Sequence, residues 1–133
     1  MKTFFKIDPR LRKKYWWLVI GVGWGLLILA FSMVSMPYIS MPDNTDKLYH
    51  AFAYCVLMGW WLQLFPQQAM RLLLVLIFIL FGVSIEVLQS LQPLRHFDIL
   101  DMLANSSGVI LAWLLGQITL LGELLYRFEK RFL

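Results

Sequence analysis

Four long apolar stretches alternate with short polar segments along this chain of 133 residues. They cover about residues 15–36, 47–65, 71–91 and 99–121, and prolines, which end helices, lie in the segments between them. A helix needs roughly 20 predominantly apolar residues to cross a bilayer core of ~30 Å, and each stretch is long enough. We therefore predict an all-α polytopic membrane protein in which residues 1–133 form a single domain, a four-transmembrane-helix bundle.

The segment after the fourth stretch, "GELLYRFEKRFL", has an amphipathic pattern. On a helix its apolar side chains share one face (Leu124, Leu125, Phe128 and Phe132), and its charged side chains share the other (Glu123, Arg127, Lys130 and Arg131). Such a helix lies in the membrane interface with its basic face against anionic headgroups. Residues 122–133 are therefore predicted to form a C-terminal interfacial amphipathic helix.

The composition supports a membrane protein, because 60% of the residues are hydrophobic and only 15% are charged. The formal net charge of +4 comes from basic residues beside the apolar stretches, where they orient a membrane protein and do not indicate a nucleic-acid partner. With the N-terminus inside, ten Lys and Arg residues lie on the cytoplasmic side and two, Lys47 and Arg95, lie outside. We predict a multi-pass protein of the bacterial plasma membrane with both termini in the cytoplasm. The first stretch is longer than the apolar region of a signal peptide, so we expect it to stay uncleaved.

Polar side chains interrupt the second, third and fourth stretches at helical intervals, in the half of the bilayer away from the cytoplasm. The resulting stripes are Asp46, His50 and Tyr54; Gly82, Glu86 and Gln89; and Asp98, Asp101, Asn105, Gly108 and Ala112. An ionisable side chain that faces lipid costs about 2.5–3.5 kcal/mol, so we expect the stripes to turn inward and form one hydrated, outward-facing pocket. Glycine and alanine on the same faces would let the helices pack closely beneath it.

The residue types predict chemical roles in this pocket. Glu86, His50 and Asp101 are candidate catalytic groups that would transfer protons. Lys47 and Arg95 would hold an anionic group such as phosphate, and the further binding candidates are Asp46, Gln89, Asp98 and Asn105. The alternative is that these groups only join the helices, through the pairs Arg95 with Asp98 or Glu86, Lys47 with Asp101, and His50 with Asn105. The spacing of His50 and the carboxylates matches no recognised metal motif, so we expect no metal and no cofactor.

The segments "DKLYHAFAY" and "EVLQSLQPLRHFDILDMLANSSG", in this order among four apolar stretches, resemble the VanZ-like family of small membrane proteins. The resemblance covers about residues 46–116 and rests on the patterns D-K-x-x-H, E-x-x-Q, R-x-x-D and D-x-x-x-N. It implies a multi-spanning membrane protein whose name-giving member is associated with resistance to teicoplanin, a glycopeptide antibiotic that acts at the outer cell surface. It also implies that the polar motif positions form a functional cluster, without assigning their chemical roles.

Three functions are compatible with such a pocket. The first is binding, with or without chemical change, of the head of an amphiphile such as a membrane lipid or a lipid-linked envelope precursor. The second is an accessory role in which the polar cluster docks a membrane protein partner. A transporter is disfavoured, because a route across the membrane needs polar groups at all depths and the inner halves of the stretches offer little beyond Gln63, Gln117 and Thr119.

Overall fold

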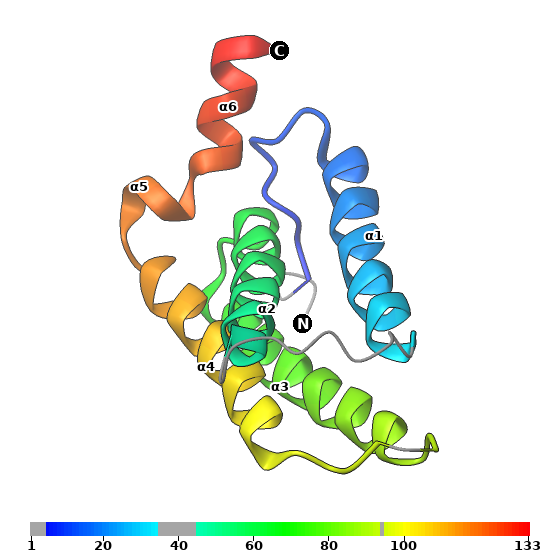
Figure 1. The fold of residues 1–133 in the computed structure, drawn as a ribbon. Coiled ribbons are helices and arrows are strands. Elements are labelled where there is room, and N and C mark those ends of the chain that lie inside the picture. Colours follow the sequence, from blue (N-terminus) through cyan, green and yellow to red (C-terminus); the bar gives the residue numbers. More distant parts are fainter. Residues whose placement is uncertain (1–4, 35–44, 94) are drawn as a thin grey trace.

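The computed structural model describes residues 5–34, 45–93 and 95–133, and the regular elements in these ranges are all helices. In chain order they are α1 (Lys14–Met33), α2 (Thr45–Leu64), α3 (Gln68–Ser90), α4 (Ile99–Leu115), α5 (Thr119–Gly122) and α6 (Leu124–Phe132), as Figure 1 shows. The all-α prediction is confirmed. The predicted end of the first stretch, at residue 36, lies outside the described residues.

Two of the helices, α1 and α3, are long and apolar enough to cross a membrane by length and composition. The apolar helix α4 is shorter, with 17 residues. Helix α2 has 20 residues, but its mean hydropathy is lowered by polar residues that include Asp46 and Lys47. The structure therefore bears out two of the four predicted spans, and the four-span bundle is not confirmed.

The fourth apolar stretch does not form one helix to residue 121 as predicted. Helix α4 ends at Leu115, and the backbone becomes extended at Ile118 before α5 begins. The carbonyl of Gly116 accepts a hydrogen bond from Arg71 Nη1 at 3.0 Å, so this acceptor is used by a side chain and not by the next turn of helix. Gly116 also packs so tightly that a Cβ there would lie 2.7 Å from Leu62 Cδ1. The helix ends where contacts with other parts of the bundle replace its own hydrogen bonds.

The core of the bundle is the packing of α2 against α4, with α3 beside both (Figure 1). The two helices meet backbone to backbone at Gly108, where an added Cβ would lie 2.1 Å from the carbonyl oxygen of Ala51. At Gly82 of α3, a Cβ would lie 3.2 Å from the Cβ of Asn105 and 3.3 Å from the ring of Tyr54. The predicted close approach of helices at these two glycines is therefore confirmed.

Helix α1 lies beside this unit and contacts it mainly through tryptophans (Figure 1). The indole N–H of Trp60 donates to the carbonyl of Trp17 at 2.9 Å, and that of Trp24 donates to the carbonyl of Ala53 at 3.3 Å. A Cβ on Gly21 would lie 2.9 Å from the Trp60 ring, so the absence of a side chain at Gly21 leaves room for this ring.

Large apolar side chains cover the outside of the bundle. They include Val19, Ile20 and Leu26 of α1, Leu72, Leu76 and Leu80 of α3, and Leu103, Leu111 and Leu114 of α4. Soluble monomers rarely expose continuous apolar surface of this kind. Together with the two long apolar helices, this surface indicates a membrane protein.

One end of the bundle, which we call the tail end, carries residues 5–13, α5 and α6 (Figure 1). There Glu129 of α6 is only 2% exposed and accepts hydrogen bonds from the backbone N–H groups of Arg12 (2.6 Å) and Lys13 (2.9 Å) and from the indole of Trp17 (2.5 Å). The first N–H groups of a helix lack partners within it, so Glu129 caps α1 from a distant part of the chain. Burial alone would raise the pKa of Glu129, but these hydrogen bonds and the charge of Arg12 lower it below its ordinary value.

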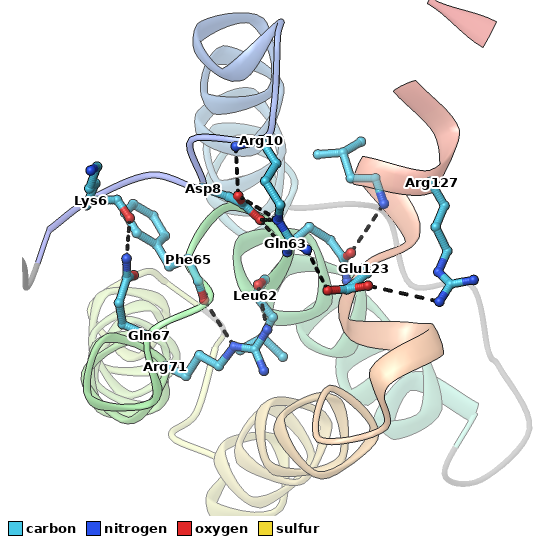
Figure 2. Close-up of polar contacts among 11 residues, drawn as sticks. Lys6, Asp8, Arg10, Leu62, Gln63, Phe65, Gln67, Arg71, Glu123 and Arg127 are labelled. Carbon is cyan, nitrogen blue, oxygen red and sulfur yellow. Dashed lines mark hydrogen bonds and ion pairs between the residues drawn. The ribbon is translucent and has the colours of Figure 1, made fainter. Parts of the chain in front are cut away.

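A second set of polar contacts joins the N-terminal segment to α6 at the tail end, and Figure 2 shows its residues. The backbone N–H of Asp8 donates to the carbonyl of Leu64 at 2.8 Å, and its carboxylate pairs with Arg10 at 2.8 Å. Arg10 also pairs with Glu123 at 2.8 Å. Nearby, the half-buried Arg71 donates to the carbonyls of Phe65, Leu62 and Gly116, which ties the ends of α2 and α4 together.

Helix α6 exposes Leu124, Phe128 and Phe132 of the predicted apolar face, and Leu125 is buried against the bundle. Exposed apolar side chains are what a helix in the membrane interface presents to lipid, and the interfacial placement stays a prediction. Glu129 of the same helix is buried as well.

Candidate functional site

A cavity of about 1130 Å³ opens at the end of the bundle opposite the tail end, between α1, the outer turns of α2 to α4, and the loop before α4. Seven of the nine predicted site residues line it: Asp46, His50, Glu86, Gln89, Arg95, Asp101 and Asn105. The other two, Lys47 and Asp98, adjoin the cavity through contacts with Asp101 and Glu86. The helical stripes therefore do turn toward a shared space.

Glu86 is the most buried acidic residue of the cavity, with 2% of its surface exposed. Its Oε1 accepts a hydrogen bond from the backbone N–H of Asp98 at 2.7 Å, which fixes the carboxylate against the start of α4. Within the described residues, its Oε2 has no hydrogen-bond partner, and the same is true of the hydroxyl of Tyr54, which also lines the cavity. A buried polar atom without a partner costs several kcal/mol in an apolar setting, on the order of 1–3 in proteins. These two atoms need a ligand or water.

His50 is held in one orientation by the neighbouring helix. Its Nδ1 lies 3.2 Å from Oδ1 of Asn105, within hydrogen-bond distance. Its Nε2 lies 3.9 Å from Oδ2 of Asp101. The ring therefore lies between an amide and a carboxylate, both on α4.

Lys47 lies at the centre of three carboxylates. Its ammonium contacts Asp98 at 2.6 Å and Asp46 at 3.2 Å, and it pairs closely with Asp101. Asp98 also caps α4, because its Oδ1 accepts a hydrogen bond from the backbone N–H of Leu100 at 2.8 Å. The hydrogen bond from Lys47, then that from Leu100, lowers the pKa of Asp98 below its ordinary value. An ammonium has three donors, so this cluster occupies Lys47 fully.

Arg95 and two glutamines hold the end of α1. Arg95 Nη1 and Gln89 Nε2 each donate to the carbonyl of Ser32 at 2.9 Å, and Arg95 Nη2 donates to that of Val34 at 2.9 Å. Gln92 Nε2 donates to the carbonyl of Met33 at 3.2 Å. The last carbonyls of a helix lack partners within it and attract positive charge, so Arg95 acts here as a cap for α1.

These contacts show which of the residue pairs suggested by the sequence form in the structure. Lys47 does pair with Asp101, and His50 with Asn105. Arg95 instead donates to the end of α1, not to Asp98 or Glu86. Lys47 and two of the five N–H groups of Arg95 have acceptors in the protein, and the expected use of these residues to hold an anion stays a prediction.

Helix α1 supplies an apolar wall that the sequence reasoning missed. Trp24, Leu27, Ile28 and Phe31 line the cavity opposite the polar stripes. Their spacing of three and four residues marks one helical face, and on it only Ser32 at the end of α1 is polar, which is a weak signal against the faces that contact lipid. Tyr54, also outside the predicted site, did have a signal in the stripe that it shares with Asp46 and His50.

Comparison with known proteins identifies the family of this chain. A family model described as VanZ/LLP1 matches residues 10–120, from the N-terminal segment through α1 to α5. The chain belongs to the VanZ/LLP1 family. The resemblance to VanZ-like proteins is thus confirmed, and the match extends beyond residues 46–116 to include the α1 wall.

An uncharacterised protein of Schizosaccharomyces pombe is 32% identical to this VanZ/LLP1 protein over 109 residues, which is 80% of this chain and 64% of the yeast protein. The chain thus matches less than two thirds of the length of that relative. No solved structure matches it.

In chemical terms the VanZ/LLP1 cavity combines a wall of hydrogen-bonding groups with a wall of hydrocarbon. Glu86, His50 and Asp101 all lie on the polar wall, where two carboxylates and an imidazole line one cavity. Among the residues that the structure describes, no group of three His, Cys, Asp or Glu side chains has a geometry that would hold a metal ion.

Proposed function

We propose that this protein crosses the membrane four times, through α1 to α4, and binds the polar head of an amphiphile in its cavity. The amphiphile is a membrane lipid or a lipid-linked precursor. Its head contacts the polar wall, and its apolar chain lies along α1 and leaves toward the bilayer.

The lengths and surfaces of α2 and α4 support four crossings. At about 1.5 Å per residue, the 20 residues of α2 span roughly 30 Å and the 17 residues of α4 roughly 25 Å. Helix α4 exposes Leu103, Leu111 and Leu114, which suits contact with lipid. Helix α2 directs Asp46 and His50 to the cavity, so its polar first turns need not face hydrocarbon.

The distribution of Lys and Arg supports the orientation. Nine basic residues lie in residues 5–14, at Arg71 or in α6, close to the tail end, and of the described basic residues only Lys47 and Arg95 lie near the cavity. An excess of basic residues marks the cytoplasmic side. The tail end, with α6 in the interface, then faces the cytoplasm and the cavity opens outward.

The observation that carries the proposal is the unpartnered Oε2 of Glu86 in a cavity of about 1130 Å³. Interhelical polar contacts in membranes average only ~0.6 kcal/mol, which is small compensation for a buried carboxylate with one unused oxygen. Packing between helices alone leaves this buried oxygen without the hydrogen bond that a ligand donor would supply. The apolar side chains of Trp24, Leu27 and Phe31 on the facing wall fit the hydrocarbon that follows a lipid head.

The family context favours a lipid over a cell-wall component. A related protein occurs in a yeast, so the ligand class fits membranes of more than one kind of cell. If the bound lipid is an envelope precursor in a bacterium, its capture would alter susceptibility to teicoplanin. Inhibitory concentrations of cells with and without the protein would test that consequence.

The direct test is native mass spectrometry of the protein purified in a neutral maltoside detergent. We expect a co-purified amphiphile of one class, and we expect its amount to fall in Glu86→Gln. Glu123→Gln, at the tail end, is the matched control and should retain it. A photoreactive residue in place of Phe31 should crosslink to lipid; crosslinks to a protein, with no bound lipid in the spectra, would replace this proposal with the accessory role.

Membrane orientation is tested separately. Cys55 is the one cysteine of the sequence, so a Cys55→Ser background allows single cysteines to be placed at exposed positions. A membrane-impermeant maleimide added to intact cells should label His96→Cys and leave Arg131→Cys unlabelled. The reverse result would invert the proposed orientation.

A further inference from the structure

The cavity is rich in hydrogen-bond acceptors. Its described acceptors include Oε2 of Glu86, which has no partner among the described residues, and the carboxylates of Asp46 and Asp101. Of the strong donors beside them, Lys47 donates to three carboxylates, and two N–H groups of Arg95 donate to backbone carbonyls. Tyr54 supplies the hydroxyl that has no partner within the described part of the chain.

The charges show the same imbalance. Four carboxylates line or adjoin the cavity (Asp46, Glu86, Asp98 and Asp101), and two permanent cations do so (Lys47 and Arg95). Counted without the histidines, the described site carries more negative than positive charge. An anionic head would meet this excess in a setting of low dielectric, where repulsion between charges is strong.

Aromatic rings add a further preference. Trp24, Phe31, Tyr49 and Tyr54 all line the cavity. The faces of such rings attract cations, and sites for quaternary ammonium groups are commonly built from them. Acceptors, net negative charge and aromatic walls thus all favour the same kind of ligand.

We propose that the head group selected by the cavity is cationic, a primary or quaternary ammonium carried by an amphiphile, with Glu86 as its counter-ion. This inference rests on the amphiphile binding proposed above and names the chemistry of the head. The ammonium lies between Glu86 and His50, and the hydrocarbon chain follows α1.

The test is a competition among amphiphiles that share a dodecyl chain and differ in the head: dodecylammonium, dodecyl phosphate and dodecyl glycerol ether. Each is added to the purified protein in a neutral detergent, and adducts are counted by native mass spectrometry. A hydrogen bond to a charged group contributes about 1.5–3 kcal/mol, so dodecylammonium should bind at least ~10-fold more tightly than the other two. Glu86→Gln keeps the shape and an oxygen for the N–H of Asp98, and it should abolish this preference.

Asp46→Asn is a second charge-removing variant at a more exposed position, and it should reduce the preference in part. Glu123→Gln should leave it unchanged. Equal binding of the three heads, or a preference for phosphate, would overturn the cationic inference while amphiphile binding stood. Absence of any dodecyl adduct, or equal binding of chainless tetramethylammonium, would instead overturn the amphiphile function.

Discussion

Gly108 is the point at which α4 meets the backbone of α2, and replacing it with alanine is expected to separate the two helices. The added Cβ would lie 2.1 Å from the carbonyl oxygen of Ala51, 2.9 Å from its carbonyl carbon and 3.0 Å from the backbone nitrogen of Cys55. Ordinary contacts between heavy atoms lie near 3.5–4.0 Å, so the helices must move apart locally by roughly 1 Å or more. No rotamer change can relieve the clash, because the obstructing atoms belong to backbone.

The expected cost follows from two opposing effects. Overpacking of this kind costs about 1–3 kcal/mol, and a fixed backbone places Gly108→Ala toward the upper end of that range. Alanine is better than glycine in a helix by about 1 kcal/mol, which offsets part of the cost. We therefore expect a net loss of about 2 kcal/mol in the free energy of unfolding.

Gly59→Ala is the matched control, because a Cβ there would meet nothing within 4 Å. It should be neutral or stabilising by up to about 1 kcal/mol. Unfolding in mixed detergent micelles, followed by tryptophan fluorescence, compares the two variants. If Gly108→Ala proves as stable as Gly59→Ala, the close approach of α2 and α4 is wrong.

The same substitution should also disturb the cavity. Ala51 follows His50, and Gly108 lies one turn beyond Asn105, so separation at Gly108 lengthens the 3.2 Å contact between His50 and Asn105. Amphiphile binding should therefore weaken in Gly108→Ala and persist in Gly59→Ala.

Three further predictions concern capping groups. Glu129→Gln should loosen α6, because either orientation of the amide sets an NH₂ group against an N–H donor; hydrogen exchange of α6 measures this. In the unchanged protein the folded pKa of Glu129 lies below its ordinary value of 4.5, so its stabilisation is complete above that pH and is lost as the pH falls through the lowered pKa. The exchange rates are first corrected for the intrinsic effect of pH. If the opening of α6 then increases toward neutral pH and does not increase in acid, this role of Glu129 is wrong. Asp98→Ala should lower the free energy of unfolding by about 1 kcal/mol through loss of the α4 cap. Asp98→Asn should keep the cap and lose the pairing with Lys47. If circular dichroism melts show equal losses of stability for the two variants, Asp98 does not act as a cap. Arg71→Met should cost about 2 kcal/mol by freeing three carbonyls, whereas Arg127→Met, at an exposed pair, should change the same melts by less than about 1 kcal/mol.

Hydrophobic periodicity was sufficient to locate the main helices, because each must cover an apolar face. Helices α1 and α3 begin and end within a few residues of the predicted stretches where the structure describes them. The end of α4 was missed because it depends on a hydrogen bond from Arg71, which lies 45 residues away from Gly116 in sequence. The burial of Glu129 on α6 could not be predicted for a similar reason, since its partners are N–H groups just before α1.

Periodicity also brought the polar stripes into one cavity, since any charge facing lipid would be costly. It did not reveal which acceptors each donor would choose. Arg95 binds the carbonyls of Ser32 and Val34, and backbone groups at a helix end leave no mark in the pattern of side chains. For the same reason, the sequence did not show that both cations also have acceptors within the protein.

The two ends of the bundle differ in a way that favours binding over transport. Below the cavity, Leu57, Met58, Leu62 and Val109 are exposed by 1% or less. At the tail end, the buried Leu11 and Leu125 pack beneath the contacts of Glu129. A route across the membrane needs polar groups at every depth, and the described residues between the cavity and the tail end are packed hydrocarbon. The cavity is therefore closed on the tail side and bounded laterally by α1. The proposed amphiphile would then enter and leave past this helix from the bilayer.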